Sequence, residues 1–146
     1  MTPARRLAVA ALLCVSLPAA ASNTRQQCES NFTTSGSFSE GRTYSTEVEV
    51  PEVEYLPALY RVRDKIQDLG LNVLAVQEKN GFIRAANPVR GGDGGGANAP
   101  LRGYVTPRDG GGVDVSLQFT IYGGQSARES TVMKYLCDMI EAADAP

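Results

Sequence analysis

The spacing of the cysteines constrains this fold more than any other feature of the sequence. The chain has 146 residues and three cysteines: Cys14 lies in an apolar N-terminal segment, whereas Cys28 and Cys137 lie near opposite ends of the remainder. An even pair of cysteines in an exported chain is typical of a disulfide. Such a bond closes a loop of about 110 residues and stabilises the fold by about 4–5 kcal/mol in the chain-entropy treatment. Two free thiols or a redox pair are the alternatives, although no Cys-x-x-Cys spacing supports the latter.

The N-terminal segment, residues 1–21, has the three parts of a secretory signal peptide. Arg5 and Arg6 supply the positive start, residues 7–17 form a short apolar run, and small side chains follow up to Ala21. We expect cleavage after Ala21 and a periplasmic or secreted mature chain. The apolar run is shorter than the roughly 20 residues that span a bilayer, so we expect no transmembrane anchor. A twin-arginine signal and lipidation are less favoured alternatives.

The charge of the mature chain is mildly negative, and its basic residues are scattered. Loss of Arg5 and Arg6 with the signal leaves 12 basic and 16 acidic residues, a formal charge of −4. Nucleic acids and anionic membranes are usually bound by clustered Lys and Arg side chains. The sequence therefore predicts no nucleic-acid partner.

Hydrophobic periodicity predicts a single α+β domain over residues 41–146. Apolar side chains that alternate with polar ones indicate strands with one buried face, and apolar residues three and four apart indicate two helices. The expected order is β-α-β-β-β-β-α, with a mainly antiparallel sheet, both helices on one face, and the disulfide joining an N-terminal arm to the last helix. The expected strands cover residues 42–50, 71–77, 82–87, 101–107 and 113–122.

Local sequence signals add detail to this outline. Residues 22–40 are polar and are expected to form an irregular arm pinned at Cys28. Gly70 should end the first helix in a left-handed conformation. Ser126 followed by Glu129 predicts a capping box at the start of the last helix. The glycine-dominated residues 90–100 are expected to form a mobile connection.

Residues that could carry chemistry are sparse. The chain has no histidine, which excludes Ser-His and Cys-His nucleophiles and the commonest metal ligand, and we expect neither metal nor cofactor. Glu47 and Glu49 share one strand face and form the best carboxylate pair. That face offers no apolar residues to build the desolvating pocket that a glycosidase acid needs. A solvated acidic face is therefore favoured over a catalytic pair.

Two tyrosines are candidates for a binding surface. Tyr104 and Tyr122 occupy outward positions on neighbouring predicted strands, and tyrosine is enriched where proteins bind partners. Cross-strand pairing that only stabilises the sheet is the alternative interpretation.

A stretch of about a quarter of the chain resembles a known family of envelope domains. Its segments are residues 56–59 (Leu-Pro-Ala-Leu), 68–71 (Asp-Leu-Gly-Leu) and 80–83 (Asn-Gly-Phe-Ile). Together they are similar to the repeated domain of BamC-like small envelope proteins, in which a helix ends in a Leu-Gly step before a hairpin. The resemblance implies a helix-grip fold and a non-enzymatic envelope role, and it assigns no functional residues. This chain lacks the lipidation signal of that family.

The sequence favours a non-catalytic function outside the cytoplasm. The leading expectation is a binding or assembly-accessory domain of the bacterial cell envelope, with an envelope protein as partner. One alternative is a small apolar ligand held in a cavity between helices and sheet, which such folds permit. A carboxylate-based hydrolase is the least favoured alternative.

Overall fold

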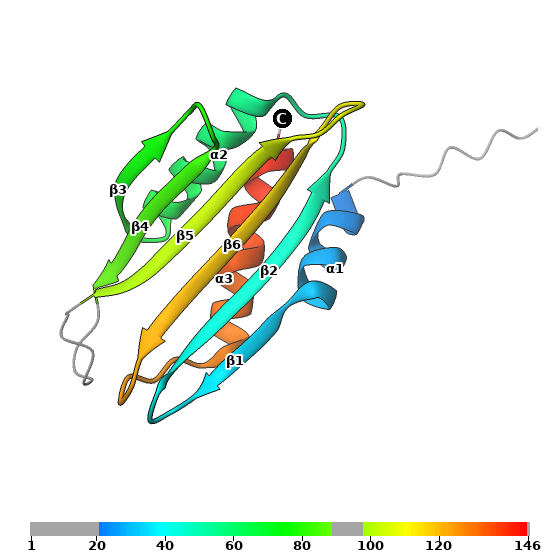
Figure 1. Cartoon of the computed structure of the whole chain (residues 1–146). Coiled ribbons are helices and arrows are strands. Elements are labelled where there is room, and N and C mark those ends of the chain that lie inside the picture. Colours follow the sequence, from blue (N-terminus) through cyan, green and yellow to red (C-terminus); the bar gives the residue numbers. More distant parts are fainter. Residues whose placement is uncertain (1–20, 89–97, 146) are drawn as a thin grey trace, which may run out of the picture.

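The computed structural model describes residues 21–88 and 98–145, which form an α+β domain (Figure 1). The predicted signal peptide and most of the glycine-rich loop lie outside these residues. In chain order the elements are α1 (Ala21–Asn31), β1 (Thr33–Ser37), β2 (Gly41–Val50), α2 (Tyr55–Asp68), β3 (Asn72–Gln77), β4 (Phe82–Pro88), β5 (Asn98–Pro107), β6 (Val113–Tyr122), α3 (Glu129–Glu141) and a short 3-10 helix, η1 (Ala142–Asp144).

The described strands form one antiparallel sheet in the order β1-β2-β6-β5-β4-β3. Figure 1 shows α2 and α3 on the same side of this sheet, with α1 beside β2. Helix α1 packs against β2 and α3, whereas α2 lies nearer β3 and β5. The predicted α+β class, the antiparallel sheet and the placement of both predicted helices on one face are confirmed.

Alternation along the strands separates a buried face from an exposed one. In β6, which lies near the middle of the sheet, every second side chain is buried beneath the helices: Val113, Val115, Leu117, Phe119 and Ile121. Hydrophobic burial of about 25 cal/mol per Å² makes this face the main source of stability. The opposite face carries polar side chains and is open to solvent.

The end of α2 is set by glycine. Gly70 has a φ of 87°, its N–H donates to the carbonyl of Gln67, and the N–H of Leu71 donates to the carbonyl of Ile66. These two bonds form a Schellman motif, which satisfies carbonyls that a helix end otherwise leaves unpaired. The predicted role of Gly70 is confirmed.

The prediction of an irregular arm over residues 22–40 was wrong, because this stretch contains α1 and β1. The helix has almost no apolar periodicity, and its stability comes from tertiary contacts. Thr24 and Cys28 are buried, and Thr46 Oγ1 of β2 donates to the Cys28 carbonyl at 2.8 Å. β1 pairs with β2 along the edge of the sheet.

The predicted capping box was also wrong. Helix α3 begins at Glu129 with Arg128 as its N-cap residue, and no side chain caps it. Ser126 lies upstream, in a loop held back towards the sheet. There the Tyr122 N–H donates to Gln125 Oε1 at 2.9 Å, and the Gly124 N–H donates to the Phe38 carbonyl. Because of these contacts, the helix begins after Ser126, at Glu129.

The predicted disulfide is confirmed and joins α1 to α3. Cys28 and Cys137 are both fully buried, and their Cα atoms lie 5.6 Å apart. The bond crosses 109 residues of sequence. It therefore connects the first described helix to the last one through the interior of the protein.

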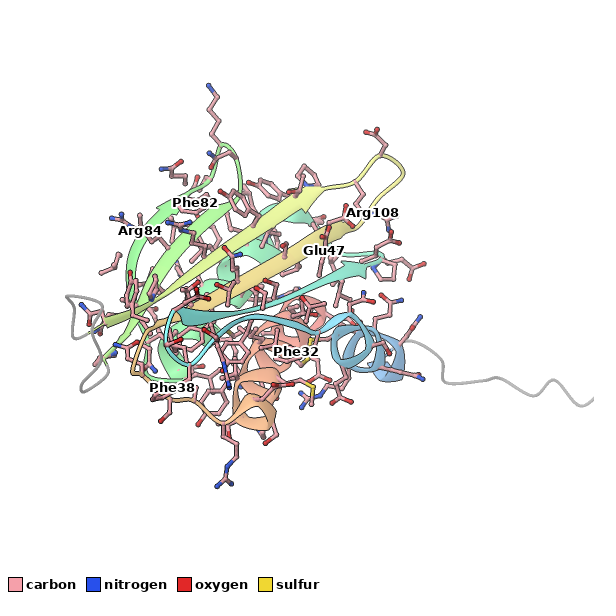
Figure 2. The ribbon with its side chains drawn as sticks, turned by 60° about the horizontal axis from the view of Figure 1, so that its bottom comes forward. Phe32, Phe38, Glu47, Phe82, Arg84 and Arg108 are labelled. Carbon is pink, nitrogen blue, oxygen red and sulfur yellow. A yellow bond between two sulfur atoms is a disulfide. The ribbon has the colours of Figure 1, made fainter. Side chains whose placement is uncertain are left out.

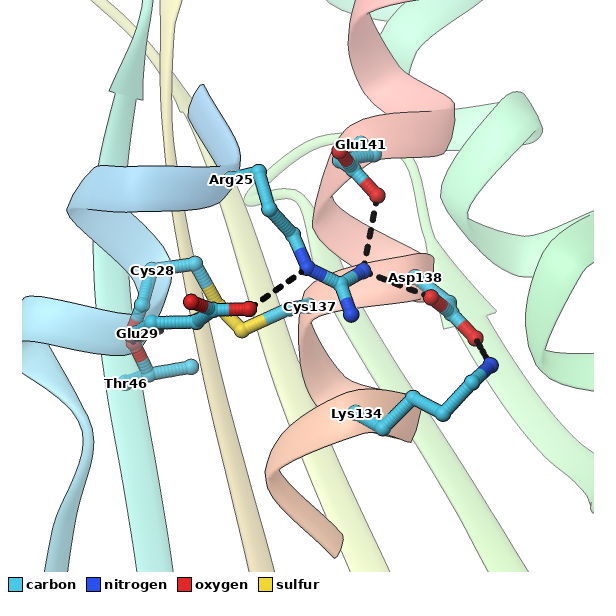
Figure 3. Close-up of polar contacts among 8 residues, drawn as sticks. All are labelled: Arg25, Cys28, Glu29, Thr46, Lys134, Cys137, Asp138 and Glu141. Atoms are coloured by element: carbon cyan, nitrogen blue, oxygen red, sulfur yellow. Dashed lines mark hydrogen bonds and ion pairs between the residues drawn. A yellow bond between two sulfur atoms is a disulfide. The ribbon is translucent and has the colours of Figure 1, made fainter. Parts of the chain in front are cut away.

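Arg25 adds a polar cluster beside this bond (Figure 3). Its guanidinium lies 2.6 Å from Asp138 Oδ1, 2.8 Å from Glu141 Oε2 and 2.9 Å from Glu29 Oε1. Lys134 Nζ lies 2.7 Å from the other carboxylate oxygen of Asp138. Burial alone would raise the pKa of Asp138, but the hydrogen bonds from Lys134 and Arg25 outweigh it and lower the pKa below its ordinary value. The cluster thus reinforces the α1–α3 contact with charge.

Replacing both bonded cysteines by serine (C28S/C137S) should lower the free energy of unfolding by about 2–5 kcal/mol, because the unfolded chain regains its freedom. Urea denaturation followed by circular dichroism measures this loss. Adding reductant to the wild-type protein should reproduce it, and reductant should not affect the double variant. Equal midpoints for the oxidised wild type and the variant would contradict the proposed role of the bond.

Replacing Asp138 by asparagine should cost about 1–3 kcal/mol near pH 7, because charge-assisted hydrogen bonds to Arg25 and Lys134 are lost. A carboxylate whose folded pKa is lowered stabilises the protein above its unfolded pKa of about 3.9 and ceases to do so as pH falls through the folded value. The stability difference between wild type and D138N should therefore shrink below about pH 4. Asp64→Asn, which removes an exposed carboxylate paired with Arg63, is the control and should change stability little at any pH.

Candidate functional site

A hollow of about 310 Å³ lies between α3 and the buried face of the sheet. Its walls are mainly apolar side chains from β5, β6, α3 and the turn between α2 and β3: Leu71, Leu101, Phe119, Ile121, Val132, Leu136 and Met139. Leu101, Leu136 and Met139 line it and are almost fully buried, so core side chains form part of its wall. We call it the α3 pocket.

A stack of aromatic rings supports one wall of this pocket. Phe119 lines the pocket, and its ring lies 6.4 Å from that of Tyr44. Tyr44 in turn stacks on Phe32, which follows α1, at 6.1 Å. Offset stacking at these distances adds to the stability gained from burial. The position of Phe119 in the wall is therefore coupled to the N-terminal elements.

The rim of the α3 pocket is polar. It includes Asn87, Arg128 and Thr131, together with Gln125, whose amide oxygen is engaged by the Tyr122 N–H. Arg128 is exposed and immediately precedes α3. The N-terminus of a helix carries a partial positive charge, and here no side chain caps it. Glu129, the first residue of α3, carries an opposing charge, so Arg128 is the basic side chain that the rim offers beside an apolar interior.

Two other hollows lie towards the end of α3 and η1. They measure about 410 and 460 Å³. Charged side chains make up half of the lining of the first and most of the lining of the second. Both are more open to solvent than the α3 pocket. Neither offers the apolar enclosure of the α3 pocket.

The two predicted surface tyrosines lie on the exposed face of the sheet but far apart. Tyr104 pairs with Ser116, whereas Tyr122 pairs with Gly41 at the end of β6. Six residues of β6 separate these positions, about 20 Å along the strand. Tyr104 instead contacts Phe82 of β4, with ring centroids 5.1 Å apart. The side chains are 47% and 37% exposed for Tyr104 and Tyr122, and the two do not form one patch.

The predicted carboxylate pair lies on the same exposed face. Glu49 Oε2 is 3.0 Å from Arg108, whose guanidinium also lies 3.2 Å from Asp114. Glu47 is exposed near this group (Figure 2). Neither glutamate lines any of the three hollows described above. The arrangement is that of a solvated ion-pair network.

Across residues 21–88 and 98–145, no three His, Cys, Asp or Glu side chains gather in a way that could hold a metal ion. None of the helices within these residues is long and apolar enough to cross a membrane.

Comparison with known proteins gave no further assignment. No protein-family model matches the chain, and no curated protein matches it. The resemblance to BamC-like envelope domains therefore stays a prediction. The α3 pocket is the candidate site that the geometry of the chain itself supports.

Proposed function

We propose that this protein is a non-catalytic binding protein that holds a small, mostly apolar ligand in the α3 pocket. The observation that carries the proposal is a mainly apolar hollow, walled in part by core side chains, that opens at a polar rim. Small-molecule sites usually combine such walls with a few polar groups that orient the ligand. This proposal corresponds to the alternative raised by the sequence, a small apolar ligand held in a cavity between helices and sheet.

The size of the pocket limits the ligand. A cavity of about 150 Å³ holds one benzene molecule, so a volume of about 310 Å³ suits roughly a dozen non-hydrogen atoms. A medium-length acyl chain or a two-ring compound has this size. Larger lipids would have to leave part of their length in solvent.

The rim favours a ligand with a polar or anionic end. Arg128 and the uncapped start of α3 lie where such a group would leave the apolar interior. Guanidinium groups bind carboxylates through paired, charge-assisted hydrogen bonds. We therefore infer a ligand of the fatty-acid type, with its carboxylate at Arg128.

A location in the periplasm or outside the cell is part of the proposal. The signal-like N-terminus and the buried disulfide support it, because disulfides persist mainly in oxidising compartments. An accessory role in envelope assembly is compatible with ligand binding and remains the wider proposal for the biological role. The resemblance to BamC-like domains supports that wider role.

Decanoate, which has a dozen non-hydrogen atoms, should bind the purified protein with one site in calorimetric titration. Val132→Phe places a ring in the pocket and should weaken binding at least tenfold. Leu74→Phe adds the same ring on the exposed side of β3, away from the pocket, and should leave affinity unchanged. Ala127→Leu, at the half-buried rim, repeats the test if V132F folds poorly. The proposal would be refuted if V132F and A127L both bind decanoate as tightly as the wild type does. It would also be refuted if the wild type does not bind decanoate.

Replacing Arg128 by glutamine should reduce decanoate affinity about three- to tenfold, the loss of one charge-assisted contact at an exposed rim. Decanol has no carboxylate, so R128Q should bind it as the wild type does. Calorimetry with both probes separates the two effects. An equal loss for decanol and decanoate would show that Arg128 acts on the shape of the pocket and not on the ligand charge.

A further inference from the structure

Four side chains form a compact block on the exposed face of the sheet. Phe82 and Arg84 lie two residues apart on β4, and they pair directly with Tyr104 and Arg102 on β5. Residues two apart on a strand share a face and lie about 7 Å apart, and directly opposite residues lie about 5 Å apart. An aromatic pair therefore lies beside an arginine pair. We call this group the aromatic–arginine block; Figure 2 shows Phe82 and Arg84 on the same strand, away from Glu47.

The position of Gly81 fixes the register of this block. Its φ is 68°, and the Val105 N–H donates to its carbonyl at 2.9 Å. A Cβ at this residue would lie 1.8 Å from the Val105 carbonyl oxygen, so another residue would force the strands apart. The turn thus holds Phe82 against Tyr104.

The arginine pair carries positive charge that no ion pair within the described residues neutralises. Like charges that lie directly opposite each other on neighbouring strands destabilise a sheet. Within the described residues, Arg84 and Arg102 have no ion-pair partner, whereas Arg108 on the same face has two. Both side chains are exposed. An anion placed between them would relieve the repulsion.

The aromatic pair and its neighbours suit a sugar ring. Tyr104 is 47% exposed, and the ring of Phe82 is tilted 41° to it, which leaves aromatic surface open to solvent. Ser116 and Gln118 of β6 lie directly beside Tyr104 and Arg102. Hydroxyl and amide groups bind sugar hydroxyls, while aromatic faces stack on the apolar face of the ring.

Acidic side chains on the neighbouring strands limit how long an anionic ligand on this face can be. Glu47 lies in the same cross-strand row as Tyr104, separated by Ser116, and Glu49 and Asp114 follow in the next row. A long polyanion that crossed the sheet would meet these carboxylates. A nucleic-acid strand gains affinity from many phosphate contacts, which this face does not offer. A short ligand with one or two negative charges fits.

We propose that the aromatic–arginine block binds a sugar unit that carries a carboxylate, such as a uronic acid at or near the end of a glycan. The carboxylate lies between Arg84 and Arg102, whose planar groups match it through paired hydrogen bonds. The sugar ring stacks on Tyr104 and Phe82. This site is on the face opposite the α3 pocket and does not depend on the function proposed for that pocket.

Titration of the ¹⁵N-labelled protein with digalacturonate, followed by NMR, tests this site. The amides of residues 82–84 and 102–104 should shift in a saturable manner, and the uncharged dimethyl ester of the same disaccharide should bind at least tenfold more weakly. R84Q, R102Q and Tyr104→Ala should each weaken digalacturonate binding about tenfold. Arg63→Gln removes a charge from α2, outside the block, and should bind as the wild type does.

Thermal denaturation supplies a second readout. Because each arginine repels the other, R84Q and R102Q should melt at or above the wild-type temperature, so lost binding would not reflect unfolding. Equal binding of the ester, or unchanged binding by R84Q and R102Q, would overturn the proposal. So would tighter binding of a thymidine dinucleotide at the same amides, since that would indicate a nucleic-acid surface.

Discussion

The covalent bond between Cys28 and Cys137 is the constraint on which the rest of this structure depends. It fixes the middle of α3 to α1, and α1 is in turn held to β2 through Thr46. Arg25 adds ion pairs to Asp138, directly after Cys137, and to Glu141, one helical turn further along α3. The last helix is thereby held against α1 from its C-terminal half. The loop before its N-terminal half is held by the hydrogen bonds of Gln125 and Gly124.

The two long helices on the inner face of the sheet cover different parts of it. α2 lies near β3 and β5, while α3 packs against α1 and β2. The walls of the α3 pocket come from β5, β6 and residues along α3, including Leu136 and Met139 on either side of Cys137. The aromatic stack from Phe32 through Tyr44 to Phe119 adjoins one of these walls. The inner face of the sheet thus offers an apolar site, and the outer face offers charged and aromatic groups.

Local patterns predicted most of the fold, because alternation and helical spacing report directly on burial. The strand over residues 113–122 and the stop at Gly70 are examples. Helix α1 was missed because few of its described side chains are buried, Thr24 and Cys28 among them, and its partner residues on α3 lie more than a hundred positions away. A capping box expected at Ser126 failed because loop contacts of Gln125 and Gly124 decide where α3 begins.

The sequence predicted the candidate sites less completely than it predicted the fold. Tyr104 was identified, but its partner Phe82 depends on the register of β4 and β5, which no local pattern encodes. The α3 pocket depends on the distance between a helix and a sheet, and Arg128 has no distinguishing sequence signal. Shape at this level follows from the tertiary contacts of the whole chain.

The central claim is that the space between α3 and the buried face of the sheet is a binding site. Intermolecular nuclear Overhauser effects between unlabelled decanoate and the ¹³C-labelled protein test it most directly. The account predicts contacts from the ligand methylenes to the side chains of Leu101, Leu136 and Met139, all of which line the pocket. Contacts confined to the exposed face of the sheet, or none to these three residues at saturation, would contradict it.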